Sequence, residues 1–282
     1  MNTTLPTLSG NRLHLWPIIQ EAIEFPWQAR HMLWKWVLVC GVLVGLIDFI
    51  SENLNVTYNA ETDGFLELSY HLALIVLQVA LTFSLYTVFC LRCHRLVLLG
   101  STPEADVFPP QFGERERDFI RFLFVILLLI IFSGIIFVFI SGILIVFGLS
   151  SLLGISDTRH EEWIHLPLLM IPVAYLTGRF CMVFPATAVD LQPSLNWAWE
   201  QSKGFTWRLG ILAGILPLLF SIIHNDGRLL FGLDQYQFVY SLISGLLWFV
   251  CATIEVAVLS IAFRELSGSD ISDWTGVRQS TP

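Results

Sequence analysis

Apolar stretches of about 20 residues are the feature of this sequence that most constrains its fold. A helix needs about 20 mostly apolar residues to cross the ~30 Å hydrocarbon core of a bilayer. Only 13% of the residues are charged and 55% are hydrophobic, whereas soluble domains carry about 25% charged residues. We therefore expect an integral membrane protein. Its six predicted spans cover residues 33–50, 68–91, 119–149, 164–185, 209–224 and 238–263.

The predicted fold is all-α, a polytopic membrane bundle of about six transmembrane helices with two interfacial amphipathic helices. Residues 1–32 form a cytoplasmic N-terminal segment that holds the first interfacial helix. The six-span membrane domain covers residues 33–263, and a short cytoplasmic tail covers residues 264–282. The third span, near 30 residues, is longer than a straight crossing requires, so we expect it to tilt, to kink or to project from the membrane.

The distribution of basic residues predicts the orientation of these spans. With both termini on the cytoplasmic side, twelve basic residues lie inside and only Arg159 and Arg228 lie outside. This asymmetry is the one that the positive-inside rule describes. No basic face accumulates, which argues against nucleic acid as a partner. The twelve inner residues are Arg12, Arg30, Lys35, Arg92, Arg95, Arg115, Arg117, Arg121, Lys203, Arg208, Arg264 and Arg278.

Two segments have the pattern of helices that lie in the plane of the membrane interface. In the first, Trp16-Pro17 opens a run in which apolar residues up to Phe25 alternate with polar ones. In the second, within residues 191–205, apolar residues recur every three or four positions. Aromatic-belt anchors or a dedicated lipid-binding surface would both explain the second pattern. Its candidate lipid contacts are Trp197, Trp199, Lys203, Trp207 and Arg208.

Arg179 and Glu255 are charged residues inside predicted spans 4 and 6. A cationic side chain near the bilayer centre costs at least ~2.5 kcal/mol on insertion scales. Counted from the cytoplasmic boundary at ~1.5 Å per residue, both residues lie ~14 to 17 Å deep. We therefore expect an intramembrane polar pair. One interpretation is an ion pair that locks the two spans, and the other is a polar cavity that binds an anionic headgroup or substrate.

Two further groups of residues have a chemical and a structural interpretation. Cys90 to His94 match the CxxCH pattern of covalent haem attachment, but the predicted orientation puts them on the cytoplasmic side, which favours reduced, buried thiols. Outside span 4, Asp157, Glu161 and His165 share one helix face. A solvated acidic loop explains that spacing as well as a metal site does. We expect neither a cofactor nor a metal.

Small residues at four-residue spacing in spans 1, 5 and 6 allow close approach of helices. They are Gly41 with Gly45, Gly210 with Gly214, and Ser241 with Gly245. Packing within one chain and a homodimer face are both compatible with this spacing. The expected partners are membrane lipids, with a second copy of the chain or another membrane protein as further possibilities.

Several cytoplasmic and span-4 segments carry a family resemblance. They are His94–Gly100, Arg179-Phe180, Pro185-Ala186, Ser194-Leu195, Ala198-Trp199, Ser202–Gly204 and Trp207–Leu209. Together, mainly over residues 90–215, they resemble a group of poorly characterised bacterial multi-spanning inner-membrane proteins. The group is similar to the membrane domain found beside some glycerophosphodiester phosphodiesterases. The catalytic barrel of those enzymes has no counterpart here, so the resemblance implies a location and supplies no catalytic residues.

Three functions follow from these observations. The first is a non-enzymatic envelope or lipid-associated accessory protein of the bacterial inner membrane, since the sequence holds no Walker loop, GxSxG, HExxH or Rossmann pattern. The second is a transporter or channel for a small or lipid-like anion, with Arg179 and Glu255 in its pathway. The third is a lipid-modifying enzyme that uses the outer His, Asp and Glu residues.

Overall fold

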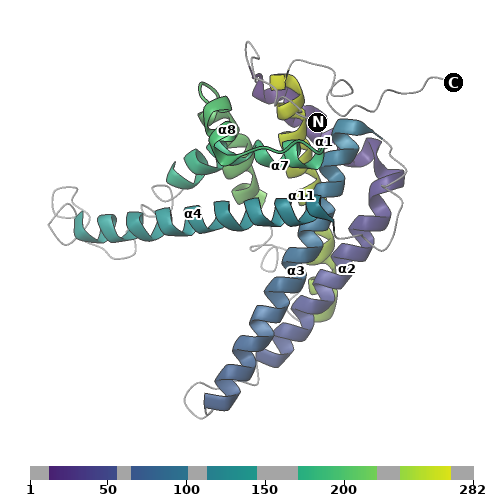
Figure 1. Ribbon diagram of the computed structural model, residues 1–282. Coiled ribbons are helices and arrows are strands. Elements are labelled where there is room, and N and C mark those ends of the chain that lie inside the picture. Colours follow the sequence, from purple (N-terminus) through teal and green to yellow (C-terminus); the bar gives the residue numbers. More distant parts are fainter. Residues whose placement is uncertain (1–12, 56–64, 101–112, 145–170, 221–235, 268–282) are drawn as a thin grey trace, which may run out of the picture.

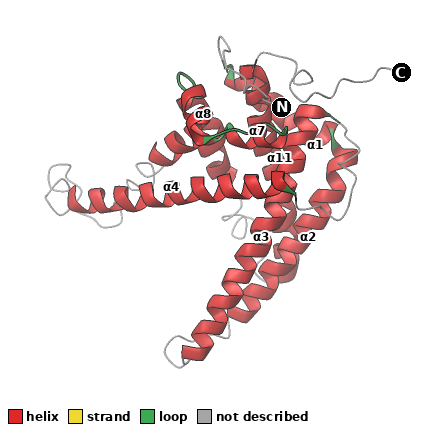
Figure 2. Ribbon diagram, viewed as in Figure 1, coloured by secondary structure: helices red, strands yellow, loops and turns green. Residues whose placement is uncertain are grey.

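The computed structural model describes residues 13–55, 65–100, 113–144, 171–220 and 236–267. This part of the chain is about 90% helical and contains no strand (Figure 2), which confirms the all-α prediction. Residues 171–180 and 216–220 are also helical. The named helices are α1 (Leu15–Gln28), α2 (Arg30–Asn55), α3 (Phe65–Leu99), α4 (Glu114–Leu144), α7 (Val183–Ala188), α8 (Leu195–Gln201), α9 (Thr206–Gly210), the π-helical turn η3 (Ile211–Ile215) and α11 (Gln237–Ser267).

Four of the described helices are long and apolar enough to cross a membrane, namely α2, α3, α4 and α11. A fifth crossing would come from α8 together with residues 206–220, two segments that are bent by 115° relative to each other. The membrane class is therefore supported with four or five spans, and the predicted number of six remains a prediction. The fourth predicted span is described only from residue 171 onward.

Two groups of helix ends lie at opposite ends of the molecule (Figure 1). Helices α1, α7 and α8 and the C-terminal ends of α3 and α11 gather at one end of the molecule. The C-terminal end of α2 and the N-terminal end of α3 lie at the other. The gathered segments are those that the charge pattern assigns to the cytoplasmic side. The side of a membrane on which they lie stays a prediction.

Glycine permits the close packing of α2 on α11. A Cβ atom added at Gly41 would lie 2.9 Å from the Cα atom of Leu246, and one added at Gly45 would lie 2.9 Å from the Cα atom of Leu242. A Cβ atom added at Gly245 would come closer still to the backbone oxygen of Gly41. In these two helices the small residues therefore pack within one chain, as the intramolecular interpretation predicted.

Gly210 and Gly214 in the fifth predicted span also pack within the chain. A Cβ atom added at Gly214 would lie 2.9 Å from the Cα atom of Ala174, which belongs to helical residues 171–180. The backbone of Gly210 approaches Gly178 of the same segment. Predicted spans 4 and 5 thus meet through glycine backbones.

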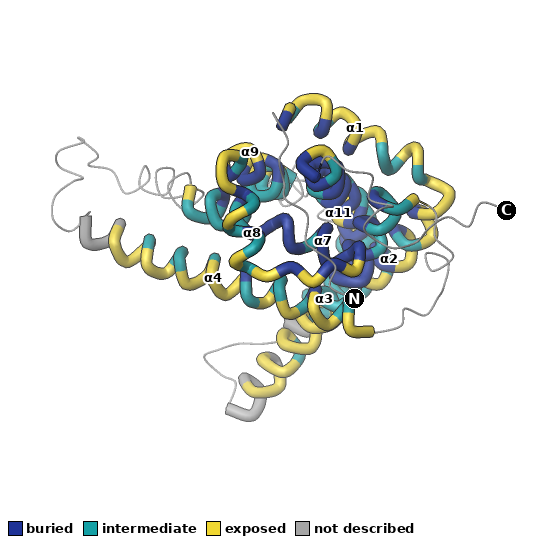
Figure 3. Tube along the Cα trace, turned by 45° about the horizontal axis from the view of Figure 1, so that its top comes forward, coloured by how far each residue is buried: buried dark blue, intermediate teal, exposed yellow. Residues whose placement is uncertain are grey.

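Helix α4 is long and mostly exposed. Its 31 residues extend over about 46 Å, and its N-terminal part packs on α7 through Phe119 and Phe184, whose rings lie 5.0 Å apart. Beyond this contact α4 runs away from the bundle, across the direction of α2 and α3 (Figure 1), and its outer part is exposed (Figure 3). Whether this long span tilts, kinks or projects from a membrane stays a prediction.

Candidate functional site

A cavity of about 190 Å³ lies where α3, α4, α7, α11 and predicted spans 4 and 5 meet. Most of its lining side chains are apolar or aromatic. The oxygen- and nitrogen-bearing side chains that line it are Tyr86, His94, Thr177 and Glu255. A partly enclosed, mainly apolar cavity with a few convergent polar groups has the composition of a small-ligand site. We take this cavity as the candidate functional site.

Three of the cavity residues come from one face of α3. Tyr86, Cys90 and His94 follow each other at four-residue spacing in an otherwise apolar span, so they stack along the same side of the helix. All three line the cavity. The four-residue spacing is present in the sequence, where Cys90 and His94 also belong to the CxxCH pattern. Tyr86 was not predicted as a site residue.

Glu255 contributes the carboxylate of the cavity. The phenol of Tyr86 on α3 interacts with this carboxylate and lines the same cavity. Among the described residues that line the cavity none is Lys or Arg, and the ion pairs found in the described ranges do not include Glu255. The carboxylate therefore faces a space without a basic counter-ion.

The other acidic residue within a predicted span is held differently. Asp48 of α2 accepts a hydrogen bond from the side-chain nitrogen of Gln78 on α3 at 3.1 Å. The Oγ atom of Ser51 donates to Oε1 of the same Gln78 at 2.5 Å. Asp48 thus belongs to a polar clamp between two helices, whereas Glu255 borders a cavity.

The hydrogen bonds of His94 assign its tautomer. Nδ1 lies 2.7 Å from Oγ of Ser260, and that hydroxyl donates its proton to the carbonyl oxygen of Val256 at 2.8 Å. A serine hydroxyl carries a single proton, so it must accept from Nδ1–H of His94. The neutral ring then keeps its lone pair on Nε2. His94 therefore adds a hydrogen-bond acceptor to the cavity wall.

The two thiols of the CxxCH pattern lie in different surroundings. Cys90 lines the cavity, whereas Cys93 is not among the lining residues and lies near Thr253. Both are free and buried. The burial agrees with the structural interpretation, in which the pattern marks a packed helix end. His94, which would ligate the iron under the haem interpretation, is 2% exposed and bonded to Ser260.

Arg179 does not pair with Glu255. Its guanidinium donates to the hydroxyl of Tyr175 at 3.2 and 3.3 Å and to the carbonyl oxygen of Trp199 at 3.1 Å. It also stacks on the Trp199 ring, 4.5 Å from the centroid. Arg179 is absent from the described cavity lining. The expectation of neighbouring side chains is therefore wrong in this structure, because equal depth left open which way each helix turns its residue.

The candidate lipid contacts around α8 divide into exposed and inward groups. Trp207 is 56% exposed, whereas Trp197 and Trp199 are half-buried. Lys203 forms an ion pair with Glu200 at 2.5 Å. Arg208 donates to the backbone oxygen of Leu13 at 2.9 Å and so ties the N-terminal segment to α9. The structure does not bring these five residues together into one continuous exposed surface.

A second exposed aromatic group lies on α1. Ile18 and Ala22 are fully buried against the bundle, while Trp16, Ile23 and Trp27 are 74%, 56% and 69% exposed. At 3.6 residues per turn the three exposed residues fall within about 40° of one another. The apolar pattern of this segment predicts the helix but does not by itself separate two apolar faces. The spacing of seven and four residues between them would have identified the second.

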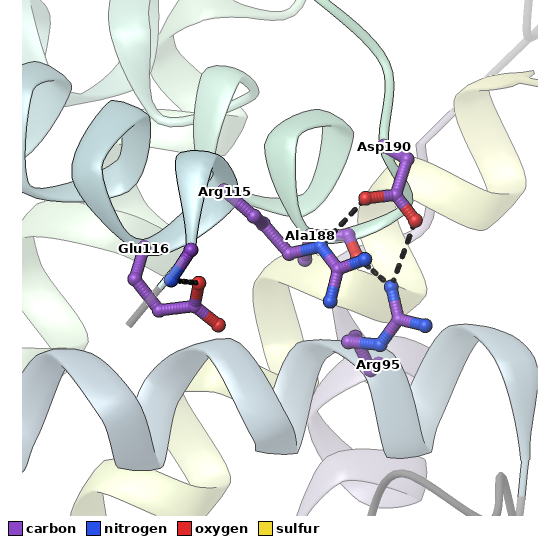
Figure 4. A network of polar contacts seen from close by, with 6 residues as sticks. Arg95, Arg115, Glu116, Ala188 and Asp190 are labelled. Atoms are coloured by element: carbon purple, nitrogen blue, oxygen red, sulfur yellow. Dashed lines mark hydrogen bonds and ion pairs between the residues drawn. The ribbon is translucent and has the colours of Figure 1, made fainter. Parts of the chain in front are cut away.

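The end of α7 carries an ionic network (Figure 4). Asp190 accepts from Arg115 of α4 at 2.6 Å and from Arg95 of α3 at 3.1 Å. Arg95 also donates to the carbonyl oxygen of Ala188 at 2.8 Å. Asp190 has a positive φ of 62°, a conformation that Asp tolerates better than most residues. The network joins three helices at the end where the predicted cytoplasmic segments gather.

The predicted outer acidic and histidine group cannot be placed. Asp157, Glu161 and His165 lie outside the described residues. Within the described ranges no group of three or more His, Cys, Asp or Glu side chains is arranged to hold a metal ion.

Comparisons with protein-family models, with curated proteins and with solved structures found no match.

Proposed function

We propose that this chain is a non-enzymatic, lipid-associated protein of the bacterial inner membrane with both termini in the cytoplasm. The apolar helices α2, α3, α4 and α11 support the membrane class. The bacterial inner membrane is implied by the resemblance over residues 90–215. The orientation is supported by the basic residues of the segments that gather at one end of the molecule.

The observation that carries this proposal is that α1 has two apolar faces. One face, with Ile18 and Ala22, is sealed against the protein, so it does not need lipid. The other face exposes Trp16, Ile23 and Trp27. Tryptophan is enriched where the headgroup layer meets the hydrocarbon. Insertion of this second face into the cytoplasmic leaflet would explain why a helix that is already packed on the protein exposes apolar residues.

Neighbouring contacts support the same placement of α1. Only Ala29 separates the C-terminal end of α1 from the membrane-length helix α2, which supports a position of α1 at the boundary of the membrane that α2 would cross. The guanidinium of Arg30 lies 5.1 Å from the Trp27 ring, where it can also meet lipid phosphate. Glu21 holds α1 to the end of α11 through Arg264 at 2.6 Å.

Spin-label accessibility in nanodiscs tests this proposal. Labels at position 16 or 27 should collide more often with dissolved oxygen, which concentrates in lipid, than with a water-soluble nickel chelate. A label at Gln28, an exposed polar position of the same helix about 100° or more around the axis from Trp16 and Trp27, is the matched control and should show the reverse preference. Preference for the nickel chelate at 16 and 27 would refute the interfacial placement.

A further inference from the structure

We propose that the cavity beside Glu255 binds an ammonium group carried on a small apolar body. The walls are mostly apolar, and the polar atoms they present are acceptors or hydroxyls. This site is independent of the lipid contacts of α1 and goes beyond the proposed lipid-associated role.

The charge of the cavity selects the sign of the ligand. Glu255 is the acidic residue among the lining side chains, and no Lys or Arg of the described chain joins it there. An ammonium group supplies the missing counter-ion, and the attraction is strong where water is scarce. A carboxylate or phosphate would meet a like charge with no basic residue beside it. The anion pathway weighed from the sequence therefore has no support in this cavity.

The remaining polar groups also suit a hydrogen-bond donor. The tautomer of His94 leaves an acceptor on Nε2. The hydroxyl of Thr177 donates its proton to the carbonyl oxygen of Val173 and so offers only lone pairs. An ammonium group carries protons for several acceptors, which makes it a better match than a group that only accepts.

Aromatic rings complete the fit to a cation. Tyr86, Phe119 and Phe184 line the cavity, and the last two rings are 5.0 Å apart. Aromatic faces attract ammonium groups, and such rings form the recognised cages for organic cations. The same rings and the neighbouring aliphatic side chains would cover the apolar body of the ligand.

The π-helical turn shapes one wall. Leu212 and Ala213 of η3 line the cavity, and π-helical turns interrupt a regular helix and are frequent at functional sites. Ala213 is small, so a larger side chain at this position would fill the space without removing the carboxylate.

Benzylamine binding to the full chain in phosphatidylcholine nanodiscs tests the proposal by calorimetry, with empty nanodiscs subtracted. Benzyl alcohol is the neutral analogue of the same shape, and benzoate is the anionic one. We expect saturable binding of benzylamine that is at least about tenfold tighter than that of the alcohol, equivalent to about 1.4 kcal/mol. Equal binding of amine and alcohol, or tighter binding of benzoate, would overturn the proposal.

Three variants connect this binding to the cavity. Glu255→Gln keeps the shape and should abolish the preference for the amine over the alcohol. Ala213→Leu should weaken both ligands because it fills the cavity. Glu265→Gln is the matched control, since Glu265 is an exposed residue of the same helix, and it should bind as the unmodified chain does. Unchanged amine preference in Glu255→Gln, at an unchanged melting temperature, would refute the site.

An ammonium group could come from a free amine or from the phosphatidylethanolamine headgroup. The headgroup carries a phosphate that meets no basic residue in the described lining. We therefore expect benzylamine to bind equally well in nanodiscs with and without phosphatidylethanolamine, which assigns the site to free amines. Competition by the lipid would refute the free amine and assign the ammonium to the headgroup.

Discussion

His94 on α3 and Ser260 on α11 are joined by a hydrogen bond of 2.7 Å between Nδ1 and Oγ. The bond is buried and links two residues that are 166 positions apart in sequence. It connects one wall of the cavity to the helix that carries Glu255. This bond gives His94 a defined tautomer and a fixed place.

Loss of the Ser260 hydroxyl should destabilise the bundle. Ser260→Ala leaves the Nδ1–H of His94 without its acceptor in a buried position, which costs about 1 to 3 kcal/mol. Thermal denaturation in detergent measures the effect. Ser84→Ala is the control, because Ser84 makes the same intrahelical bond, to Ala80, at an exposed position. Equal melting temperatures for the two variants would contradict the tautomer assignment.

Arg179 and Glu255 should be energetically independent. They share no hydrogen-bonding partner in the described chain, so the stability changes of Arg179→Met and Glu255→Gln should add within about 0.5 kcal/mol. Arg179→Met with Trp199→Leu should instead be non-additive, because those two residues stack. A double-mutant cycle on unfolding free energies separates the two cases. Strong coupling of Arg179 to Glu255 would restore the predicted ion pair.

The contact of α2 with α11 should not tolerate a methyl group. Gly245→Ala places a carbon against the backbone of Gly41, and overpacking of this kind costs about 1 to 3 kcal/mol. At Gly113 the neighbouring atom is only the flexible carboxylate of Glu116, so Gly113→Ala should have little effect. Melting temperatures test both. A Gly245→Ala chain as stable as the Gly113→Ala chain would mean that the helices pack less closely.

The stability of variants at Asp190 should depend on backbone conformation as well as on charge. Its carboxylate is half-exposed, so the two ion pairs contribute little, about 0 to 1 kcal/mol each. Its φ of 62° penalises most side chains by roughly 1 to 2 kcal/mol, and Asn less. Asp190→Asn should therefore be more stable than Asp190→Ala by about 1 kcal/mol. The reverse order in thermal denaturation would exclude backbone strain as the main effect.

Reporter fusions test the orientation. The basic asymmetry predicts external reporters after residues 60, 158 and 230 and cytoplasmic reporters after residues 105 and 200. A single reversed site would remove one predicted span. Inversion of all five would refute the orientation and with it the cytoplasmic placement of α1.

Much of the fold follows from local sequence. Chains in hydrocarbon must satisfy their own backbone hydrogen bonds, so long apolar stretches become helices, and α2, α3, α4 and α11 match predicted spans within several residues at each end. Helix ends also follow local rules. Gly100, with a φ of 73°, ends α3, and the Ser194 hydroxyl accepts from the Trp197 amide at 3.0 Å to begin α8.

Residue spacing and depth along a helix are properties of one segment, so the sequence by itself determined them. They include the membrane-length helices, the four-residue spacing of Tyr86, Cys90 and His94, and the position of Arg179 and Glu255 inside predicted spans. The direction in which each helix turns its residues depends on its neighbours. Gly41 and Gly245 set the approach of α2 to α11, as Gly178 and Gly210 do for predicted spans 4 and 5. In the folded chain Arg179 lies against Trp199 and Glu255 borders a cavity. Only the tertiary structure decided these partners, because contact energies act between segments that no local pattern relates.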